Sequence, residues 1–534
     1  GTPTVYIKIT PWRTIGNDVE VLSGGEIRVW VDLVNFPVTF SHPYMLNGGK
    51  QVEKRATIDE TEYLIICPSE FASAAYSLAD MHNNEVSTVG INKLNTEVVL
   101  KDDITNMELR SYILERISDG LPNLEFLLLL GDENSLPPLQ KMYYSNNGEL
   151  KKFSSDDYYS TPNLFLDTDE TDDSSGNPQL YTGRIPVSTV EDATAVVNKI
   201  RQYILNATPG FWRSKVALVA DDILISCSPD IKDTSHTFHS QELYETLKTL
   251  LPVLPFYGVH YNLQNCEYPD LTQNLIQAIN GGVALINYIG HGDPEKWAGE
   301  KFLWKSRDLP LIHPSENRLA IWVAGTCSFG NYYGQNSFME SLLVKEKGAI
   351  AIIATTDEIG YTPNWNYISN LFEGIENYIN NEQDTRLGKL VSDAKGGDKI
   401  FHTFGDPALP LPFPKIEENL VEYPENIYLV EDQSISFNEP SQHSSILIRE
   451  NENDFIFDYR SGSFEYTMPG ATYMQMEDAE NSACFHIPLD AGSCDDCVVI
   501  QTYQEDVSRW NGKIETRLNI SLLESDTEFG DIQG

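Results

Sequence analysis

The sequence predicts an α/β protein whose central parallel sheet is covered by helices on both faces. Continuous apolar runs, such as FLLLLG at 126–131, have the length and composition of fully buried strands. Stretches with helical spacing, such as 190–205, alternate with these runs from about residue 62 onward. Because strands buried on both faces read as unbroken apolar runs, and helices connect parallel neighbours, this alternation favours a parallel sheet.

Seven apolar runs are the predicted strands, and six segments with helical spacing are the predicted helices around them. The strands are expected within 62–69, 96–100, 124–132, 215–222, 283–292, 318–327 and 349–358. The helices are expected within 71–84, 104–120, 190–205, 239–251, 268–282 and 337–348. The segment 104–120 also ends in glycine, which is a frequent stop signal for a helix.

The chain has 534 residues, enough for several domains. Three are predicted: a short β segment at 1–60, the α/β domain at 61–412, and an immunoglobulin-like β-sandwich at 413–534. The first shows alternating apolar and polar positions at 4–10 and 24–34. The second is expected to contain two subdomains, roughly 61–205 and 206–412. The third follows a proline-rich stretch at 407–427 and has about seven short alternating strands in a hundred residues, which is typical of a sandwich.

The charge balance limits the classes of partner. The sequence carries 37 basic and 79 acidic residues, a net charge of −42. Such a chain is repelled by phosphate backbones and anionic lipids, so nucleic-acid binding is not expected. Its longest apolar run is far shorter than the roughly 20 residues that cross a bilayer, so no transmembrane segment is expected. The composition fits a secreted or cell-surface protein and leaves basic or neutral partners and divalent cations open.

The seven cysteines give a second indication of compartment. Three of them, Cys484, Cys494 and Cys497, lie close together near the end of the sequence. In an extracellular protein, a disulfide from Cys484 to one of the other two is favoured. The Cys-x-x-Cys pair at 494 and 497 also suits a redox pair or half of a zinc site, although no second such pair completes four ligands. The odd total leaves at least one thiol free, and Cys327 is the candidate.

One loop is dense in carboxylates. The segment DTDETDDSSGN at 167–177 suits either a structural calcium loop or a solvated acidic turn. It lacks the residue spacing of an EF-hand, so the motif itself does not decide between the two. No other metal is predicted, and no cofactor is required.

A histidine and a cysteine follow two successive predicted strands. His291 lies between Gly290 and Gly292 at the end of one strand, and Cys327 follows the next strand 36 residues later. Successive parallel strands usually lie side by side, and reactive groups gather at their carboxyl ends. The spacing therefore predicts that His291 and Cys327 face each other at one edge of the sheet.

These two residue types suit nucleophilic catalysis. A cysteine attacks as thiolate, and a nearby imidazole favours that state or removes the proton during attack. The backbone N–H groups of Gly292 and Cys327 are candidate donors to an oxyanion. The alternative is a purely structural one, in which Gly-His-Gly is a turn and Cys327 is a small core residue. The occurrence of both residues at successive strand ends favours the catalytic interpretation.

Several motifs resemble the gingipain family of cysteine peptidases. YIGHGDPEKW at 288–297 resembles the family's histidine motif, and VAGTCSFGNY at 323–332 resembles its nucleophile motif. Further matches follow the family's order between about 62 and 412: LLLLGDENSLPP, SSDDYY, YTGRIPVSTVEDATAVVNKIRQYI, FWRSKVALVADD, SFMESLLVKEKGAIAIIATT and TFGDPALPL. The resemblance implies a caspase-like fold and an immunoglobulin-like module after it.

The resemblance also implies roles for individual residues. It makes Cys327 the nucleophile, His291 the general base and acid, and Gly292 and Cys327 the backbone oxyanion donors. A carboxylate after the strand of VALVADD orients the histidine in this family. Asp222 is the predicted residue, with Asp221 as the alternative, because a shift of one residue in that loop changes the assignment.

The implied activity is that of an exported cysteine endopeptidase, acting on protein or peptide substrates through a thioester acyl-enzyme. One alternative within the family is the PorU-like sortase of type IX secretion, in which an amine takes the acyl group. The resemblance therefore leaves surface or secretion-system partners open. Another is a non-catalytic surface protein on the same scaffold. The Arg-cleaving members carry an acidic specificity residue for which Asp233 and His236 show no clear correspondence, so trypsin-like specificity is not predicted.

Overall fold

The computed structural model describes residues 12–15, 18–21, 60–118, 123–144, 150–162, 177–224, 234–315, 317–334, 336–381, 385–395, 400–459, 462–477, 482–506 and 510–524. The chain divides into two compact units, residues 1–55 and 56–534. The first contains an antiparallel pair, β1 (Trp12–Ile15) and β2 (Asp18–Val21). The strands predicted at 4–10 and 24–34 lie outside the described residues.

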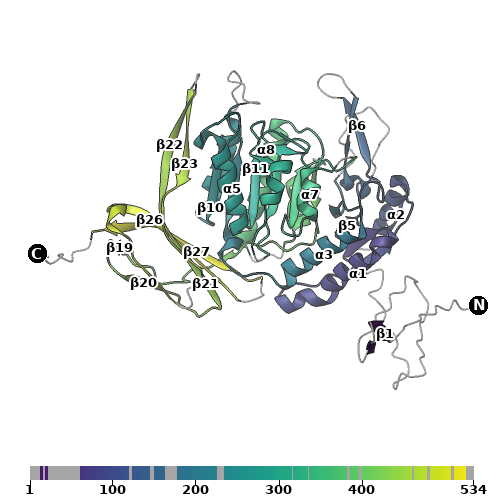
Figure 1. Cartoon of the computed structure of the whole chain (residues 1–534), viewed down its shortest axis with the longest axis horizontal. Helices are drawn as coiled ribbons and strands as arrows, with labels where there is room; N and C mark the ends of the chain where they lie inside the picture. Colours follow the sequence, from purple (N-terminus) through teal and green to yellow (C-terminus); the bar gives the residue numbers. More distant parts are fainter. Residues whose placement is uncertain are drawn as a thin grey trace, which may run out of the picture. The chain divides into compact units, whose positions relative to one another are not determined.

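The α/β part of the second unit is built on a ten-stranded sheet (Figure 1). Its order is β10 (Val253–Tyr257), β9 (Val216–Ala220), β11 (Leu285–Ile289), β15 (Ile321–Gly325), β16 (Ala351–Thr355), β17 (Phe401–Phe404), β8 (Tyr181–Ile185), β5 (Phe126–Leu130), β3 (Tyr63–Cys67) and β4 (Thr96–Leu100). All seven predicted strands belong to it. Both predicted subdomains contribute strands to this sheet, so their division stays a prediction.

The sheet is mixed, and the prediction of a parallel sheet is wrong at one pairing. The strands from β10 to β16 are parallel to one another, and so are those from β17 to β4. The two sets meet where β17 pairs antiparallel with β16. An apolar run shows that a strand is buried but not which way it runs, and β17 is only four residues long. The carboxyl ends of β9, β11, β15 and β16 therefore share one edge.

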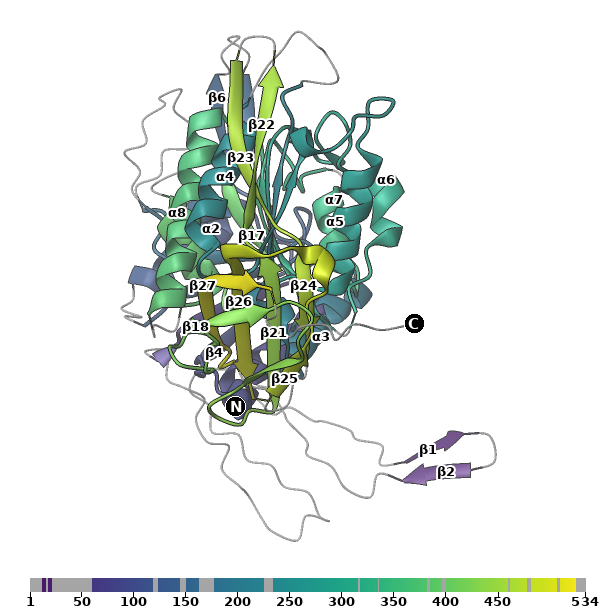
Figure 2. The same ribbon diagram turned by 90° about the vertical axis from the view of Figure 1, so that its left-hand side faces the viewer.

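Helices cover both faces of the half that contains β9 to β16. Leu285 and Ile289 of β11 belong to the same apolar core as α4 (Ser235–Leu247) and α8 (Tyr361–Asn380). Ile286 and Tyr288 point the other way, into a core with α5 (Pro269–Gly281) and α7 (Phe338–Val344). Figure 2 shows α4 and α8 on one side of the sheet and α5 and α7 on the other. This period-two alternation is what a strand buried on both faces requires.

The remaining elements complete the α/β domain. They are α1 (Ala72–Asp80), α2 (Asn106–Ser118), α3 (Val190–Leu205), α6 (Lys305–Asp308), α9 (Leu387–Lys395), β6 (Gln140–Tyr144), β7 (Leu150–Ser154), β12 (Gly292–Asp293), β13 (Lys296–Trp297) and β14 (Leu303–Trp304). Within the part of the chain that the structure describes, none of the helices combines the length and apolar character needed to cross a membrane.

The C-terminal region is a β domain with its own apolar core. Its main sheet contains β18 (Lys415–Ile416), β27 (Lys513–Leu523), β26 (Cys494–Glu505), β21 (His443–Glu450), β24 (Thr472–Met476) and β19 (Asn426–Tyr428). Two further pairs are β20 (Gln433–Ser436) with β25 (Ser482–Phe485), and β22 (Glu452–Tyr459) with β23 (Gly462–Pro469).

The disulfide predicted for this domain is wrong in its partners. Cys494 and Cys497 bond to each other, and Cys484 is a free, exposed thiol. The Cα atoms of Cys494 and Cys497 lie 5.8 Å apart, within the range that a disulfide spans. The pairing also removes both sulfurs as zinc ligands. Cys327 is free, as predicted, and so is the buried Cys67.

A buried ion pair joins the β domain to the α/β domain. The guanidinium of Arg213, which follows α3, donates to the carboxylate of Glu505 at the end of β26, and both side chains are almost fully buried. Glu505 Oε2 also accepts from the hydroxyl of Tyr503 at 2.6 Å and from the N–H of Gly210 at 3.2 Å. Trp510 Nε1 donates to the carbonyl of Ile204 at 3.0 Å. Hydrogen bonds made by Glu505 and Trp510 thus join the β domain to the end of α3 and the segment that follows it.

We predict that Arg213→Met lowers the free energy of unfolding by about 3–5 kcal/mol, because it leaves the Glu505 carboxylate buried without its cation. Denaturant titration measures this loss. Arg213→Met with Glu505→Leu should recover most of it. The matched control is Lys389→Ala, which removes an exposed pair with Asp393 and should cost less than about 1 kcal/mol. A cost for Arg213→Met no larger than that of the control would contradict the prediction.

Candidate active site

Three neighbouring strands bring the candidate residues to one edge of the sheet. Ile289 of β11 pairs with Gly325 of β15 on one side and with Ala220 of β9 on the other. His291 lies two residues after Ile289, and Cys327 lies two residues after Gly325. Asp221 directly follows Ala220, the last residue of β9. Adjacent strands lie about 4.8 Å apart. The shared edge predicted for His291 and Cys327 is therefore present.

The two glycines around His291 permit close contact on either side. A Cβ at Gly290 would collide with Cβ of Asp221 and with the hydroxyl of Tyr288. A Cβ at Gly292 would lie 2.7 Å from Oγ1 of Thr326, the residue before Cys327. The missing side chain of Gly290 thus leaves space for the loop after β9, and that of Gly292 leaves space for the loop after β15. The His291 loop touches both of its neighbours because it lacks these side-chain atoms.

Asp221 holds the His291 loop through the backbone. Its side chain is fully buried, and its Oδ2 accepts from the N–H of His291 at 2.8 Å. The hydroxyl of Tyr288 donates to the carbonyl of His291 at 2.6 Å and lies 3.3 Å from the same Oδ2. Burial, followed by the charge of Asp222, raises the pKa of Asp221 well above its usual range.

Asp222, the predicted orienting carboxylate, has other partners. Its Oδ2 accepts from the hydroxyl of Tyr268 at 2.5 Å, and its Oδ1 accepts from the N–H of Leu224 at 2.6 Å. Burial raises its pKa to about 6. Among the described residues, no hydrogen bond joins Asp222 to His291. The structure therefore places the alternative, Asp221, against the histidine segment.

The imidazole of His291 packs against a second histidine. His236, in the first turn of α4, meets it edge to face, with ring centroids 5.1 Å apart and planes at 88°. Three side chains, those of Asp221, His236 and His291, each offer one atom that could bind a metal. These three atoms lie within 4.8 Å of one another. Nε2 of His291 is buried and has no hydrogen-bond partner among the described residues. No sequence motif marks His236 as a neighbour of His291.

Cys327 is half-buried at the mouth of the same edge. Its Sγ lies 3.7 Å from the carbonyl of Ile359, and no hydrogen bond within the described ranges joins it to an imidazole. Burial raises the pKa of its thiol; Glu358 and Asp357 raise it further, and Lys151 and the Ile359 contact oppose them. The net effect of these surroundings favours the thiol form of Cys327 over the thiolate.

The turn after Cys327 is held by the end of β16. Ser328 has a positive φ of 57°, which is uncommon for a residue with a side chain. Its N–H lies 3.0 Å from the carbonyl of Asp357 and 3.1 Å from Oγ1 of Thr355. The Thr355 hydroxyl in turn donates to the carbonyl of Thr326 at 2.5 Å. Thr355 therefore fixes the backbone on both sides of Cys327, a role that no sequence motif indicated.

The predicted oxyanion donors lie on the same two loops. Gly292 begins β12, which pairs with β13 through Gly292 and Trp297. Trp297 also stacks on Tyr288, with centroids 4.6 Å apart. This small sheet fixes the position of the Gly292 backbone beside Thr326. The role of Gly292 and Cys327 as donors stays a prediction.

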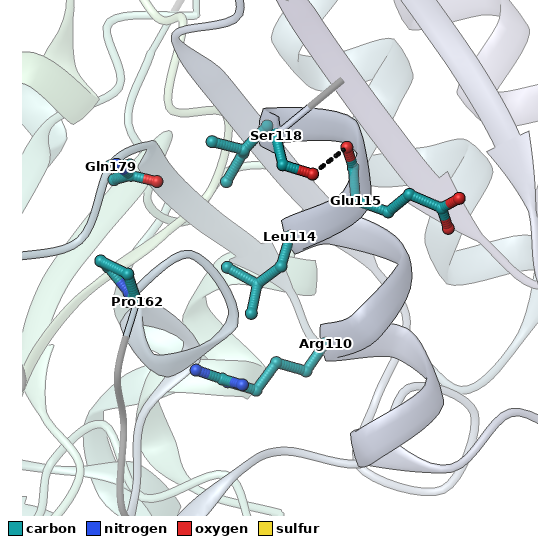
Figure 3. Close-up of a pocket in the computed structure, with 7 residues that line it drawn as sticks. Arg110, Leu114, Glu115, Ser118, Pro162 and Gln179 are labelled. Atoms are coloured by element: carbon teal, nitrogen blue, oxygen red, sulfur yellow. Dashed lines mark hydrogen bonds between the residues drawn. The ribbon is translucent and has the colours of Figure 1, made fainter. Parts of the chain in front are cut away.

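Figure 3 shows a pocket lined by α2, Pro162 and Gln179, and it contains none of the candidate residues. The guanidinium of Arg110 in this pocket donates to the carbonyls of Tyr158 and Thr161. The proposed calcium loop at 167–177 and Asp233 lie outside the described residues, apart from the last residue of the loop.

We predict that Gly292→Ala lowers the free energy of unfolding by about 1–3 kcal/mol, because the new Cβ meets Thr326 Oγ1 and lies 2.9 Å from the carbonyl of Lys296. Denaturant titration measures the change. Gly281→Ala is the matched control, since a Cβ there meets nothing within 4 Å and should be neutral or slightly stabilising. Equal stability of Gly292→Ala and the wild type would show that the two loops do not touch as described.

Comparisons with known proteins identify relatives for most of this domain. The chain is 22% identical to Gingipain R2 of Porphyromonas gingivalis over 377 residues, which cover 65% of this chain and 45% of that protein. It is 27% identical to Lys-gingipain W83 of the same species over 267 residues, covering 47% of this chain and 13% of that protein. The chain thus spans less than half the length of these curated relatives.

The fold is shared with a solved structure. The crystal structure of the Arg-specific cysteine proteinase gingipain R superposes with a TM-score of 0.53 and 16% identity, covering 87% of this chain and 98% of that chain. At this identity the likeness shows the fold alone. The model of Peptidase family C25 matches residues 57–412, which is more than half of the sequence. The predicted kinship is thereby confirmed: the chain belongs to peptidase family C25, the family of the gingipain-type cysteine peptidases.

Proposed function

We propose that this protein is an exported cysteine endopeptidase of the gingipain type, with Cys327 as nucleophile and His291 as general base and acid. The observation that carries this proposal is the register of β11 and β15. Ile289 pairs with Gly325, and His291 and Cys327 each follow two residues after this pair. The contact between Gly292 and Thr326 supports it, because it brings the two loops together.

The chemistry follows from the protonation state of Cys327. Because burial keeps the cysteine a thiol, His291 takes its proton as Sγ attacks the scissile carbonyl carbon. The imidazolium then gives that proton to the leaving amine, and the C–N bond breaks to leave a thioester on Sγ. Water attacks the thioester, His291 takes a proton from the water, and the thiol is restored as the acid product leaves.

This sequence requires the Sγ–imidazole distance to shorten when substrate binds, as catalytic hydrogen bonds commonly do. The N–H groups of Gly292 and Cys327 would donate to the oxyanion that forms during each attack. One such donor typically contributes a factor of about 100 to 1,000 in rate. Asp221 acts as a positioning residue, because its carboxylate holds the backbone of His291 rather than the imidazole.

We also propose where the protein acts and how its C-terminal β domain is folded. The acidic composition and a disulfide in the β domain support an exported or surface protein acting on protein substrates. The β domain at 413–534 is proposed to be immunoglobulin-like, which its separate core and antiparallel strands support. No cofactor is required by the mechanism, and a structural calcium ion at 167–177 stays a proposal.

Cleavage of a diverse peptide library, with and without an added amine, tests this function. Wild type should hydrolyse peptides and react with a thiol-directed peptidyl inhibitor. Cys327→Ala should lose both, with kcat/KM falling more than about a thousandfold. Cys484→Ala, which removes an exposed free thiol, should retain full activity and is the matched control.

Other outcomes would replace the proposal. Undiminished hydrolysis by Cys327→Ala would exclude the assigned nucleophile. Amide products dominating in the presence of the amine would identify a sortase-type transpeptidase instead. A wild-type protein that neither cleaves nor reacts with the inhibitor would favour a non-catalytic surface role.

A further inference from the structure

Asp221, His236 and His291 form a compact set of metal-ligating side chains. Their ligand atoms come from three different elements, namely the end of β9, the first turn of α4 and the loop after β11, yet all lie within 4.8 Å of one another. Asp221 and His236 are buried, and His291 is half-buried. Two imidazoles and one carboxylate in this arrangement are a ligand set that suits zinc and related transition metals.

The positions of these groups are set by surrounding contacts. The carboxylate of Asp221 is held by the N–H groups of His291 and Asp222, the latter at 3.0 Å from Oδ1. The hydroxyl of Thr237, next to His236 on α4, donates to the carbonyl of Asp221 at 3.3 Å. This bond ties the first turn of α4 to the loop after β9. The three side chains are thus brought together by the fold rather than by a flexible surface loop.

An imidazole nitrogen in this cluster lacks a partner. Nε2 of His291 is buried and accepts or donates no hydrogen bond among the described residues. Leaving a buried polar atom unpaired costs about 1–3 kcal/mol. A cation bound to this nitrogen would supply the missing partner.

The charge around the cluster also favours a cation. Asp222 and Glu300 are buried beside Asp221, and one oxygen from each of the three carboxyl groups lies within 4.8 Å of the others. Within the described ranges, neither Asp221 nor Asp222 forms a salt bridge. Buried carboxylates that repel one another are stabilised by a nearby positive charge.

We propose that Zn²⁺ binds to Asp221, His236 and His291, with water completing a tetrahedral site. Zinc–ligand bonds of about 2.0–2.2 Å bring the three ligand atoms closer together than the 4.8 Å limit within which they now lie. Ca²⁺ prefers six to eight oxygen ligands, so two imidazoles select zinc over calcium. A zinc-bound His291 has no lone pair available for the proton of Cys327. Resting on the proposed function, this makes Zn²⁺ a reversible inhibitor of the same site.

Binding is tested on the full chain carrying Cys327→Ala, which removes the thiol as a ligand and prevents self-cleavage. Calorimetric titration with Zn²⁺ should show one tight site per chain. Adding His236→Gln should weaken this binding at least tenfold. His239→Gln is the matched control, because His239 lies on the same helix and is equally buried but is stacked on Trp365 and bonded to Tyr361.

A second measurement keeps all three ligands intact. Co²⁺ bound to the Cys327→Ala chain should give the intense visible absorption of a tetrahedral site with nitrogen and oxygen ligands, and Zn²⁺ should displace it. Octahedral Co²⁺ absorption, or Zn²⁺ affinity unchanged by His236→Gln, would overturn the proposal. Tight binding of Ca²⁺ that does not depend on His236 would place the ion on the carboxylates instead.

Inhibition is measured separately, on the wild-type chain. Zn²⁺ should abolish peptide hydrolysis, a chelator should restore it, and His236→Gln should raise the inhibitory Zn²⁺ concentration at least tenfold. Full hydrolysis with zinc bound would refute the inhibition but leave the peptidase proposal intact. If the wild-type chain binds Zn²⁺ but cleaves no peptide, the zinc site would stand and the peptidase proposal would fail. The binding assays can show this because they need no peptidase activity.

Discussion

The arrangement of the candidate site depends on one hydrogen bond, from the backbone N–H of His291 to the buried carboxylate of Asp221. It joins the end of β9 to the segment that follows β11. On the opposite side, Gly292 lies against Thr326, which precedes Cys327 in the loop after β15. Three neighbouring strand ends are thereby locked together, and each is anchored in a sheet buried on both faces. The loops can hold a histidine and a cysteine at a defined separation because the strands beneath them cannot slide in register.

The same buried carboxylate links the proposed peptidase site with the proposed zinc site. Asp221 lies among Asp222, Glu300, His236 and His291, so the carboxylate that holds the His291 backbone also belongs to a set of side chains that could bind a metal. The raised pKa of Cys327 fits a cysteine that is activated only when a substrate arrives. In the proposed mechanism, Zn²⁺ bound to His291 would keep this thiol inactive until the metal is removed.

Much of the α/β domain was predictable, because buried strands have a distinct pattern. The seven apolar runs all became strands, and two of them carried His291 and Cys327 to one edge. β8 was missed because it contains Gly183 and the buried Arg184, which pairs with Asp156 and does not read as apolar. The antiparallel pairing of β17 was missed because its direction depends on the path through α8 and α9. The disulfide between Cys494 and Cys497 was missed because it depends on the geometry of the strand that holds them. The spacing of the cysteines along the sequence does not reveal that geometry.

The site was predictable only in part, for reasons visible at single residues. Asp221 and Asp222 are adjacent, so a sequence motif cannot show which carboxylate turns toward His291 and which toward Tyr268. His236 reaches the site from α4, where nothing in the helical spacing distinguishes a residue facing a catalytic edge from one facing the core. Thr355 acts through its hydroxyl on the Cys327 turn, and a threonine at a strand end is too common to signal that role.

The most direct test of this account compares Asp221→Ala with Asp222→Ala in peptide hydrolysis, with a chelator present to exclude bound metal. Asp221→Ala removes the acceptor for the His291 backbone and should lower kcat/KM by about a hundredfold or more. Asp222→Ala should lower it less than about tenfold, because its hydrogen bonds run to Tyr268 and Leu224. Thermal unfolding confirms that both variants fold. A larger loss for Asp222→Ala would contradict the central claim.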